Sequence, residues 1–254
     1  MSDQVLFERR EHIAVITINR PERKNAFDRA TAYAMEAAVD TFEADDELRV
    51  AVLTGAGGVF CAGQDIIAAG KGELGLTERR GGGGIMALPP EKPVIAAVEG
   101  HAVGGGLELC LSCDLVVAAS TAKLGLPEAK RGFPAMGGGL FRLPRRIPYA
   151  IAMEAAITGA VWPATRFHEL GLVNRVTEPG EALSGALELA GEVAAAGPVA
   201  VRASKAIVRH SSEWTDEDSW QNQQPFVDQV VNSADYREGM TAFAEKRAPV
   251  WKGR

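Results

Sequence analysis

Hydrophobic and polar positions alternate along the first twenty residues, and the pattern then lengthens into helical and fully apolar segments. Residues 3–19 alternate on both sides of a charged tip at 9–12, which predicts a β-hairpin. Asp28 follows a polar loop and is placed to cap a helix. The side of this helix that we expect to be buried carries Tyr33, Met35, Val39 and Phe42.

Two later stretches share one pattern, in which a buried strand leads through glycines towards a helix. The strand predicted at 49–55 is followed by a corner at 59–66, and the strand predicted at 94–98 leads through Gly104 to Gly106 into an apolar helix. Glycines between buried elements indicate that something approaches bare backbone there. Because free N–H groups at a helix start attract negative charge, the glycine corner is a candidate anion site.

A glycine-rich segment from Ala68 to Pro90 separates the two corners, with seven glycines between Gly70 and Gly84. This composition predicts a mobile lid or the wall of an acyl pocket. A surface linker is the alternative, because glycine runs alone carry no chemistry.

From Tyr149 onward the pattern is helical, and the only strand it predicts is short, at 172–176. We therefore predict an α/β core domain over residues 1–195 and a helical region over 196–254. In places the second region is too small to bury the apolar side chains of its own helices. We therefore expect these helices to complete their burial against another subunit.

Composition and charge exclude several classes of protein. The 254 residues are 46% hydrophobic and 24% charged, which is ordinary for one main globular domain. The net charge of −6 argues against a nucleic-acid partner. We find no apolar run of membrane-spanning length and no signal-peptide core before the first strand, so we expect a cytoplasmic protein with no membrane partner. Basic residues concentrate in the last twelve positions, which suits a small polyphosphate.

The three cysteines, Cys61, Cys110 and Cys113, are few for a disulfide scaffold. Cys110 and Cys113 lie one turn apart on an apolar helix, whereas a redox or zinc site would want a polar loop or a second ligand pair. We interpret them as small buried hydrophobic residues and expect no metal site.

The two corners can each direct one backbone N–H at a single point, and the candidate donors are those of Gln64 and Gly105. Two converging N–H groups form an oxyanion hole for a carbonyl oxygen that gains charge. Glu108 lies about one helical turn beyond the glycines, and Glu128 follows at a turn that proline begins. Such a pair of carboxylates can exchange protons with water and carbon if burial separates their pKa values.

Two other classes of site fit less well. A serine hydrolase needs a serine with a histidine partner, and no serine lies at either corner, although His101 is near the glycines. A dinucleotide site at 100–106 fails on the glycine spacing and on the missing acidic residue that would bind ribose.

Together, these motifs resemble those of the crotonase (enoyl-CoA hydratase/isomerase) superfamily, and of enoyl-CoA hydratases in particular. The resemblance covers essentially the whole chain. The motifs that carry it are Asn19-Arg20-Pro21, Asn25-Ala26, the stretch 60–66, the stretch 104–109, Pro127-Glu128, Glu238-Gly239-Met240 and the stretch 243–247.

The resemblance implies an α/β spiral of ββα units, as in the ClpP/crotonase fold, that assembles as a trimer or a dimer of trimers. It implies that the N–H groups of Gln64 and Gly105 hold a thioester carbonyl, that Glu108 activates water and that Glu128 handles the proton at the alpha carbon. CoA, which is part of the substrate and not a separate cofactor, would be gripped by the residues Lys24, Ala26, Ala62, Asp65, Ile66 and, often from a neighbouring subunit, Lys246.

The sequence also departs from the family. Gln64 stands where hydratases often carry a small residue, so we expect its side chain to crowd the acyl group or to touch substrate. Keeping both glutamates favours hydration, while an enoyl-CoA isomerase and an acyl-CoA-binding protein with little turnover are the alternatives. The acyl group itself is expected to be selected by the segment 68–90.

Overall fold

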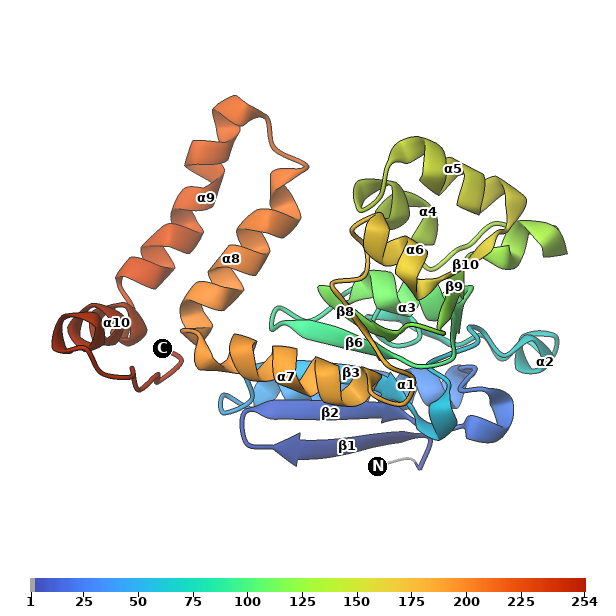
Figure 1. The fold of residues 1–254 in the computed structure, drawn as a ribbon, viewed down its shortest axis with the longest axis horizontal. Helices are drawn as coiled ribbons and strands as arrows, with labels where there is room; N and C mark the ends of the chain where they lie inside the picture. The colour runs from blue at the N-terminus through green and yellow to red at the C-terminus, as the bar shows by residue number, and fades with distance from the viewer. Residues whose placement is uncertain (1–2) are drawn as a thin grey trace.

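The computed structural model describes residues 3–254, and its centre is a six-stranded sheet whose strands follow one another in chain order (Figure 1). β1 (Val5–Arg10) and β2 (Ile13–Ile18) form the predicted hairpin, with Val5 opposite Ile18. The next strands lie parallel to β2 and to one another; they are β3 (Val50–Gly55), β6 (Val94–Val98), β8 (Leu115–Ala119) and β11 (Arg175–Thr177).

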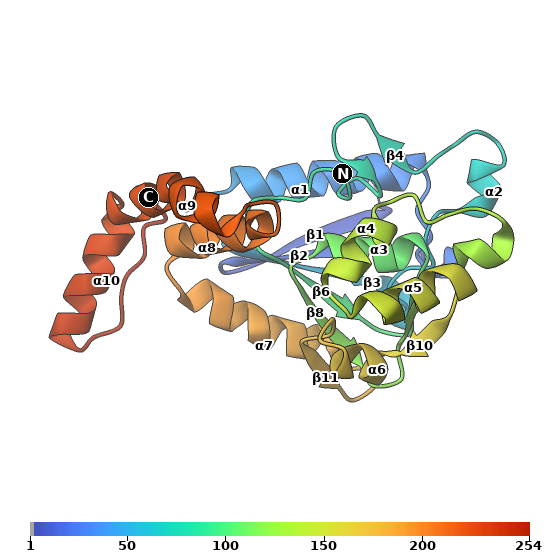
Figure 2. The same cartoon turned by 90° about the horizontal axis from the view of Figure 1, so that it is seen from above.

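Both faces of this sheet are covered, which explains the fully apolar strands. Val50 and Val52 of β3 pack in a cluster with α7 (Ala182–Ala195), whereas Ala51 and Leu53 belong to a larger core with α1 (Arg29–Ala44). Figure 2 shows α1 and α7 on opposite sides of the strands. Asp28 caps α1 as predicted, accepting a hydrogen bond from the Thr31 N–H at 2.9 Å.

The prediction for Tyr33 was wrong. Its side chain is 43% exposed, while Met35, Val39 and Phe42 are buried as expected. The phenol hydroxyl of Tyr33 donates to Glu78 at 2.5 Å, so a tyrosine at the edge of the apolar stripe is held by its polar end.

A second layer repeats the connection from strand to helix. β7 (His101–Val103), β9 (Lys123–Gly125) and β10 (Val161–Pro163) form a small sheet, and Cys61 joins it by a bridge to Ala102. Each turn of the chain therefore passes through the large sheet, then the small one, then a helix; the helices are α2 (Ile66–Ala69), α3 (Gly105–Ser112) and the 3-10 helix η3 (Pro127–Arg131). This confirms the α/β spiral of ββα units.

The sequence predicted only one strand after Tyr149, at 172–176. This prediction was wrong, because β10 is also a strand. Its three residues pair with β9 in antiparallel register at a sheet edge. A three-residue edge strand ending in proline is too short to show alternation. The expected strand at 172–176 forms over Arg175–Thr177.

The segment 68–90 is tied to the core. It contains a small hairpin of β4 (Leu76–Thr77) and β5 (Gly81–Gly82). Arg80 beside it is 2% exposed, and its guanidinium pairs with Asp40 at 2.8 Å and Glu43 at 3.0 Å on α1. The same guanidinium donates to the Leu88 carbonyl at 2.6 Å, so one side chain joins the turn of the hairpin to α1 and to the end of the segment.

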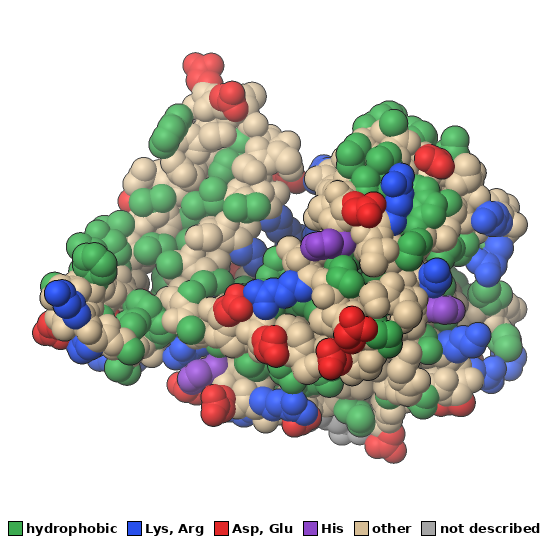
Figure 3. Space-filling model, viewed as in Figure 1, with side chains coloured by type: hydrophobic (Ala, Val, Ile, Leu, Met, Phe, Trp, Pro, Cys, Tyr) green, Lys and Arg blue, Asp and Glu red, His purple; other side chains and the backbone are tan. Residues whose placement is uncertain are grey.

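Helices dominate the remainder of the chain. Close to the second sheet lie α4 (Gly139–Arg142), the 3-10 helix η4 (Leu143–Arg145), α5 (Tyr149–Thr158) and α6 (Ala164–Glu169). The last helices, α8 (Pro198–Ser211), α9 (Asp216–Val231) and α10 (Ala234–Glu245), form an arm that projects from the sheet (Figures 1 and 2). Figure 3 shows apolar side chains spread over this arm. Trp220 on α9 is 77% exposed, and Phe243 on α10 is 85% exposed.

Two further sequence interpretations can be compared with the fold. The three cysteines are fully enclosed, and burial raises the pKa of Cys61 and Cys113 to about 12, which confirms their interpretation as small buried hydrophobic residues. Within residues 3–254, no helix is both long and apolar enough to cross a membrane.

Candidate active site

The two corners predicted from the sequence lie side by side. Cys61 bridges Ala102 in the second sheet, which places the turn after Cys61 against the start of α3. A Cβ atom at Gly63 would lie 2.9 Å from the Gly105 nitrogen, and one at Gly105 would lie 3.3 Å from the Gln64 nitrogen. The structure therefore brings together the two backbone N–H groups that the sequence singled out.

The N–H groups of Gln64 and Gly105 donate to no other group among the described residues. Gly105 begins α3, where the first N–H groups of a helix have no intrahelical acceptor. Gly104 before it has φ +59°, a backbone conformation that glycine adopts without strain. The ring of Phe27 leaves no space for a side chain at Gly105, since a Cβ there would lie 2.8 Å from the ring. Two unpaired N–H groups in close proximity can both donate to an oxyanion and so bind it.

Glu108 projects from the first turn of α3 and is 4% exposed. Its Oε1 accepts hydrogen bonds from the Gly137 N–H at 2.7 Å and the Gly139 N–H at 2.9 Å. Burial raises the pKa of Glu108, while these two N–H groups and the charge of Arg142 act in the opposite direction. Glu108 therefore does not face solvent, and its carboxylate is fixed by a turn about 30 residues away in the sequence.

Glu128 lies in the first turn of η3 and is 7% exposed. Its Oε1 would lie 3.1 Å from a Cβ atom at Gly104, so the carboxylate sits beside the glycine corner. Its Oε2 is buried and has no hydrogen-bond partner among residues 3–254. Burial, and then the neighbouring carboxylate of Glu108, raise the pKa of Glu128.

A cavity of about 610 Å³ opens beside Glu128. It lies among η3, η4 and α5, and apolar side chains line most of it, including Leu126, Phe133, Leu143, Tyr149, Ala152 and Ile157. This size and character suit a small apolar group with one reactive polar end.

The expectation that the segment 68–90 selects the acyl group stays a prediction, and none of its residues lines this cavity. Arg80 fixes that segment on α1, whereas η3 and α5 enclose the cavity. Met86 is the part of the segment that approaches the site, and its sulfur packs against Gly137 behind Glu108.

The loop at Lys24 to Ala26 lies next to the first corner, since the Ala62 N–H donates to the Lys24 carbonyl at 3.0 Å. Lys24 and Asn25 have left-handed backbone, with φ of 51° and 55°. The buried Asn25 amide donates to the carbonyls of Ala56 at 2.8 Å and Val59 at 2.5 Å, which fixes the loop. The expected CoA-binding residues 24, 26 and 62 therefore come together in space.

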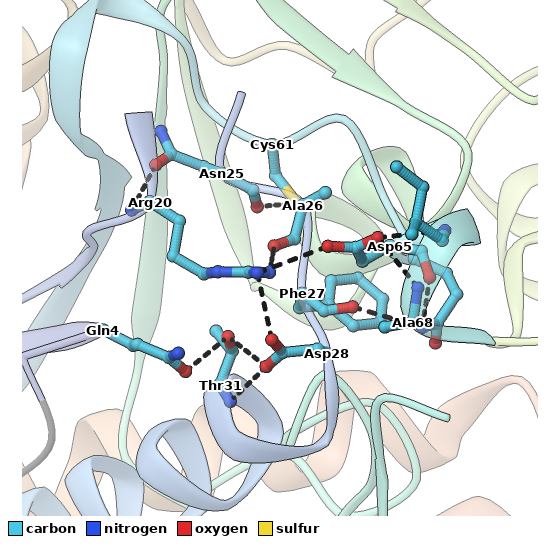
Figure 4. Close-up of polar contacts among 12 residues, drawn as sticks. Gln4, Arg20, Asn25, Ala26, Phe27, Asp28, Thr31, Cys61, Asp65 and Ala68 are labelled. Atoms are coloured by element: carbon cyan, nitrogen blue, oxygen red, sulfur yellow. Dashed lines mark hydrogen bonds and ion pairs between the residues drawn. The ribbon is translucent and has the colours of Figure 1, made fainter. Parts of the chain in front are cut away.

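Arg20 joins this loop to the first corner from below (Figure 4). Its guanidinium pairs with Asp28 at 3.0 Å and Asp65 at 3.3 Å, and it donates to the Ala26 carbonyl. Asp65 also caps α2 through the N–H groups of Ile67 and Ala68. Burial opposes ionisation of Asp65, but the Ala68 N–H and the Arg20 charge outweigh it and hold its pKa below the usual value.

The Asp65 carboxylate is thus occupied by the protein. The neighbouring Ile66 is 61% exposed.

The Gln64 side chain is also occupied. Its Oε1 accepts from the Gly75 N–H at 2.8 Å, and its Nε2 donates to the carbonyls of Asp65 at 3.2 Å and Phe27 at 3.3 Å. The amide therefore connects the segment 68–90 to the first corner, a role that its sequence position alone did not suggest.

Lys246 is the one expected site residue that the fold of a single chain does not bring to the others. It ends α10 in a left-handed conformation, and Figure 1 shows α10 at the opposite end of the molecule from α2. Within one chain it cannot reach a ligand held at Lys24 and Ala62.

Known proteins resemble this chain in sequence and in fold. Residues 8–254 match the family Enoyl-CoA hydratase/isomerase. A carnitinyl-CoA dehydratase from Salmonella typhi is 43% identical, with all of both chains covered. Among solved structures, an enoyl-CoA hydratase from Mycobacterium tuberculosis H37Rv is 50% identical with a TM-score of 0.97, and a carnitinyl-CoA hydratase from Mycobacterium avium is 38% identical with a TM-score of 0.79, each over the full length of both chains.

A match over nearly the whole chain, together with a fold shared at this level of identity, shows that the protein belongs to the enoyl-CoA hydratase/isomerase family of the crotonase superfamily.

Proposed function

We propose that the protein is an enoyl-CoA hydratase, which reversibly adds water across the 2,3 double bond of a 2-enoyl-CoA thioester to give a 3-hydroxyacyl-CoA. The N–H groups of Gln64 and Gly105 bind the thioester oxygen and stabilise the charge that it gains. The acyl group occupies the cavity beside Glu128.

The pair of unequal carboxylates is the observation that carries this proposal. Glu108 accepts two N–H hydrogen bonds, whereas Glu128 Oε2 accepts none. On this asymmetry we assign Glu128 the role of proton donor and Glu108 the role of base. Glu108 takes a proton from water as the oxygen adds to the beta carbon, and Glu128 gives its proton to the alpha carbon. Proton exchange with solvent then restores both groups.

The proposal also covers the CoA part of the substrate and the assembly of subunits. We propose that CoA runs along Lys24 to Ala26 and the backbone at Ala62, Asp65 and Ile66. Lys246 would reach the CoA site of another subunit, because the CoA site of its own chain lies at the opposite end of the molecule. Residues 196–254 then form the assembly region of a trimer or a dimer of trimers.

The test is the hydration of crotonyl-CoA, followed by loss of the enone absorbance. Glu108→Gln and Glu128→Gln should each lower the rate by on the order of 10²- to 10⁴-fold, because each removes a proton-transfer group. Glu169→Gln on α6 is the matched control, since Glu169 is exposed and lies outside the site, and it should keep the wild-type rate.

Wild-type rates in either site variant would contradict the two-glutamate mechanism. A protein that binds CoA esters without turnover would instead be an acyl-CoA-binding protein, and one that moves the double bond without adding water would be an isomerase.

A second candidate is the dehydration of carnitinyl-CoA, the substrate named for the Salmonella typhi relative. Carnitine carries a trimethylammonium group, and aromatic faces attract such cations. Phe133 and Tyr149 line the cavity beside Glu128. If this candidate holds, Phe133→Leu and Tyr149→Leu should raise KM for carnitinyl-CoA and leave KM for 3-hydroxybutyryl-CoA unchanged. An equal change for both substrates would count against it.

A further inference from the structure

A half-buried arginine that the proposed mechanism does not use lies behind Glu108. Arg142 ends α4, and its guanidinium donates to the carbonyls of Met86 at 2.6 Å and Gly137 at 3.2 Å and to the Ser112 hydroxyl at 3.2 Å. Among the residues that the structure describes, it forms no ion pair with a carboxylate. Its partners are all neutral, which is unusual for an enclosed charge.

These contacts join the pieces of chain that surround the Glu108 carboxylate. Gly137 gives its carbonyl to Arg142 and its N–H to Glu108 Oε1. Ser112 accepts from Arg142 and donates to the Glu108 carbonyl at 2.8 Å. The arginine therefore holds the turn on one side of Glu108 and α3 on the other.

Most charges around Arg142 are positive, and Glu108 is the negative group that acts on it. Burial, then Arg209 and Arg146, lower the pKa of Arg142, with a smaller contribution from Arg145. Glu108 is the acidic group that acts against them. The acidic group that faces Glu108 from η3 is the Glu128 carboxyl, so the positive charge that acts on Glu108 comes from Arg142.

We propose that Arg142 is a positioning residue that holds the 137–139 turn on Glu108 and directs its positive charge at the Glu108 carboxylate. Its kinetic consequence rests on the proposed function, whereas its effect on the titration of Glu108 does not. The positioning of the turn and the effect of the charge can be separated by Arg142→Lys. Lysine keeps the charge but lacks the planar guanidinium that reaches three acceptors.

The kinetic test compares the pH dependence of kcat/KM in Arg142→Met, Arg142→Gln and Arg142→Lys. Loss of the charge should move the acidic limb, which reports ionised Glu108, upward by about one pH unit. Arg142→Lys should keep the limb in place and lower kcat roughly tenfold through poorer positioning. The matched control is Arg145→Met, a 55% exposed arginine in the next turn, which should behave like the wild type.

A second measurement is independent of turnover. Carboxyl ¹³C NMR on glutamate-labelled protein, assigned with Glu108→Gln and Glu128→Gln, should place the pKa of Glu108 below that of Glu128, and Arg142→Met should raise it. If both neutral variants fail to fold, Arg142→Lys decides, because a wild-type kcat in that variant would contradict the positioning role. Glu108 titrating above Glu128, an unmoved limb in folded Arg142→Met, or an equal shift in Arg145→Met would overturn the proposal. If no enoyl thioester is turned over but NMR shows the pKa of Glu108 rising in Arg142→Met, the proposed function is contradicted and this inference is supported.

Discussion

At the residue scale, the buried Glu128 makes the stability of the fold depend on pH. Its pKa is raised from an ordinary 4.5, chiefly by burial, so the folded chain binds this proton more tightly than the unfolded chain. Its contribution to stability is complete below the unfolded pKa. The contribution is lost as the pH rises through the window between the unfolded and the folded pKa.

Glu128→Gln removes this titration, so its melting temperature should exceed that of the wild type at neutral pH. The gain should be largest at neutral pH and should vanish as the pH falls below 4.5, the ordinary pKa of this carboxyl. Thermal unfolding across this pH range measures it, with Glu169→Gln as the flat control. A difference that stays constant with pH would show that ionisation of Glu128 is not its cause.

Gly105→Val should reduce hydration of crotonyl-CoA by roughly 10²-fold or more, because the new side chain must displace the Phe27 ring and the Gln64 N–H. Gly191→Ala on α7 is the matched control, since a Cβ there meets nothing within 4 Å. Unchanged activity in Gly105→Val would mean that Gly105 does not donate to the substrate.

The candidate residues that could be found from the sequence are those marked by local pattern. Glycines between a strand and a helix indicated Gln64 and Gly105, and glutamates in apolar surroundings indicated Glu108 and Glu128. The turn at Gly137 and Gly139 could not be assigned to Glu108, since those hydrogen bonds span 29 and 31 residues. Arg142 follows the last of these glycines by three residues, and its sequence position did not single it out as part of the site.

At the scale of elements, the segment 68–90 shows how composition can mislead. Its glycines predict freedom, yet Arg80 fixes the hairpin to α1 through ionic and carbonyl contacts. An arginine in a polar stretch reads as surface in the sequence, because its partners on α1 lie about 40 residues earlier. Short strands such as β10 escape prediction for a related reason, since their partners and not their own residues define them.

Arg80→Met should release this hairpin and lower stability by about 1–3 kcal/mol, less than for a fully buried pair because Asp40 and Glu43 stay partly hydrated. Limited proteolysis should then cut within 70–88. Arg79→Met is the control, since Arg79 also pairs with Asp40 but is 49% exposed. Equal protease sensitivity of the two variants would contradict the anchoring role of Arg80.

At the scale of the molecule, the arm of α8 to α10 leaves apolar side chains in water that a single chain does not cover. Light scattering should give about three or six times 26.9 kDa. Phe243→Asp on α10 should weaken the assembly, while Leu6→Asp on β1 should not, although both side chains are exposed. A wild-type monomer would contradict the proposed assembly and, with it, the supply of Lys246 from another subunit.

The class of fold was predictable at this scale because apolar strands separated by helical segments require a parallel sheet covered on both faces. The spiral itself was predictable only through family resemblance. No local pattern shows that Cys61 would pair with Ala102 or that strands would split between two sheets.

The strand order β1-β2-β3-β6-β8-β11 has a consequence for synthesis. A chain that leaves the ribosome from its N-terminus can add each strand to an edge that already exists, without waiting for a distant partner. The glutamate of α3, however, is made before the turn at 137–139 that receives it. The growing chain therefore completes most of its sheet while the future reaction centre is still open to water.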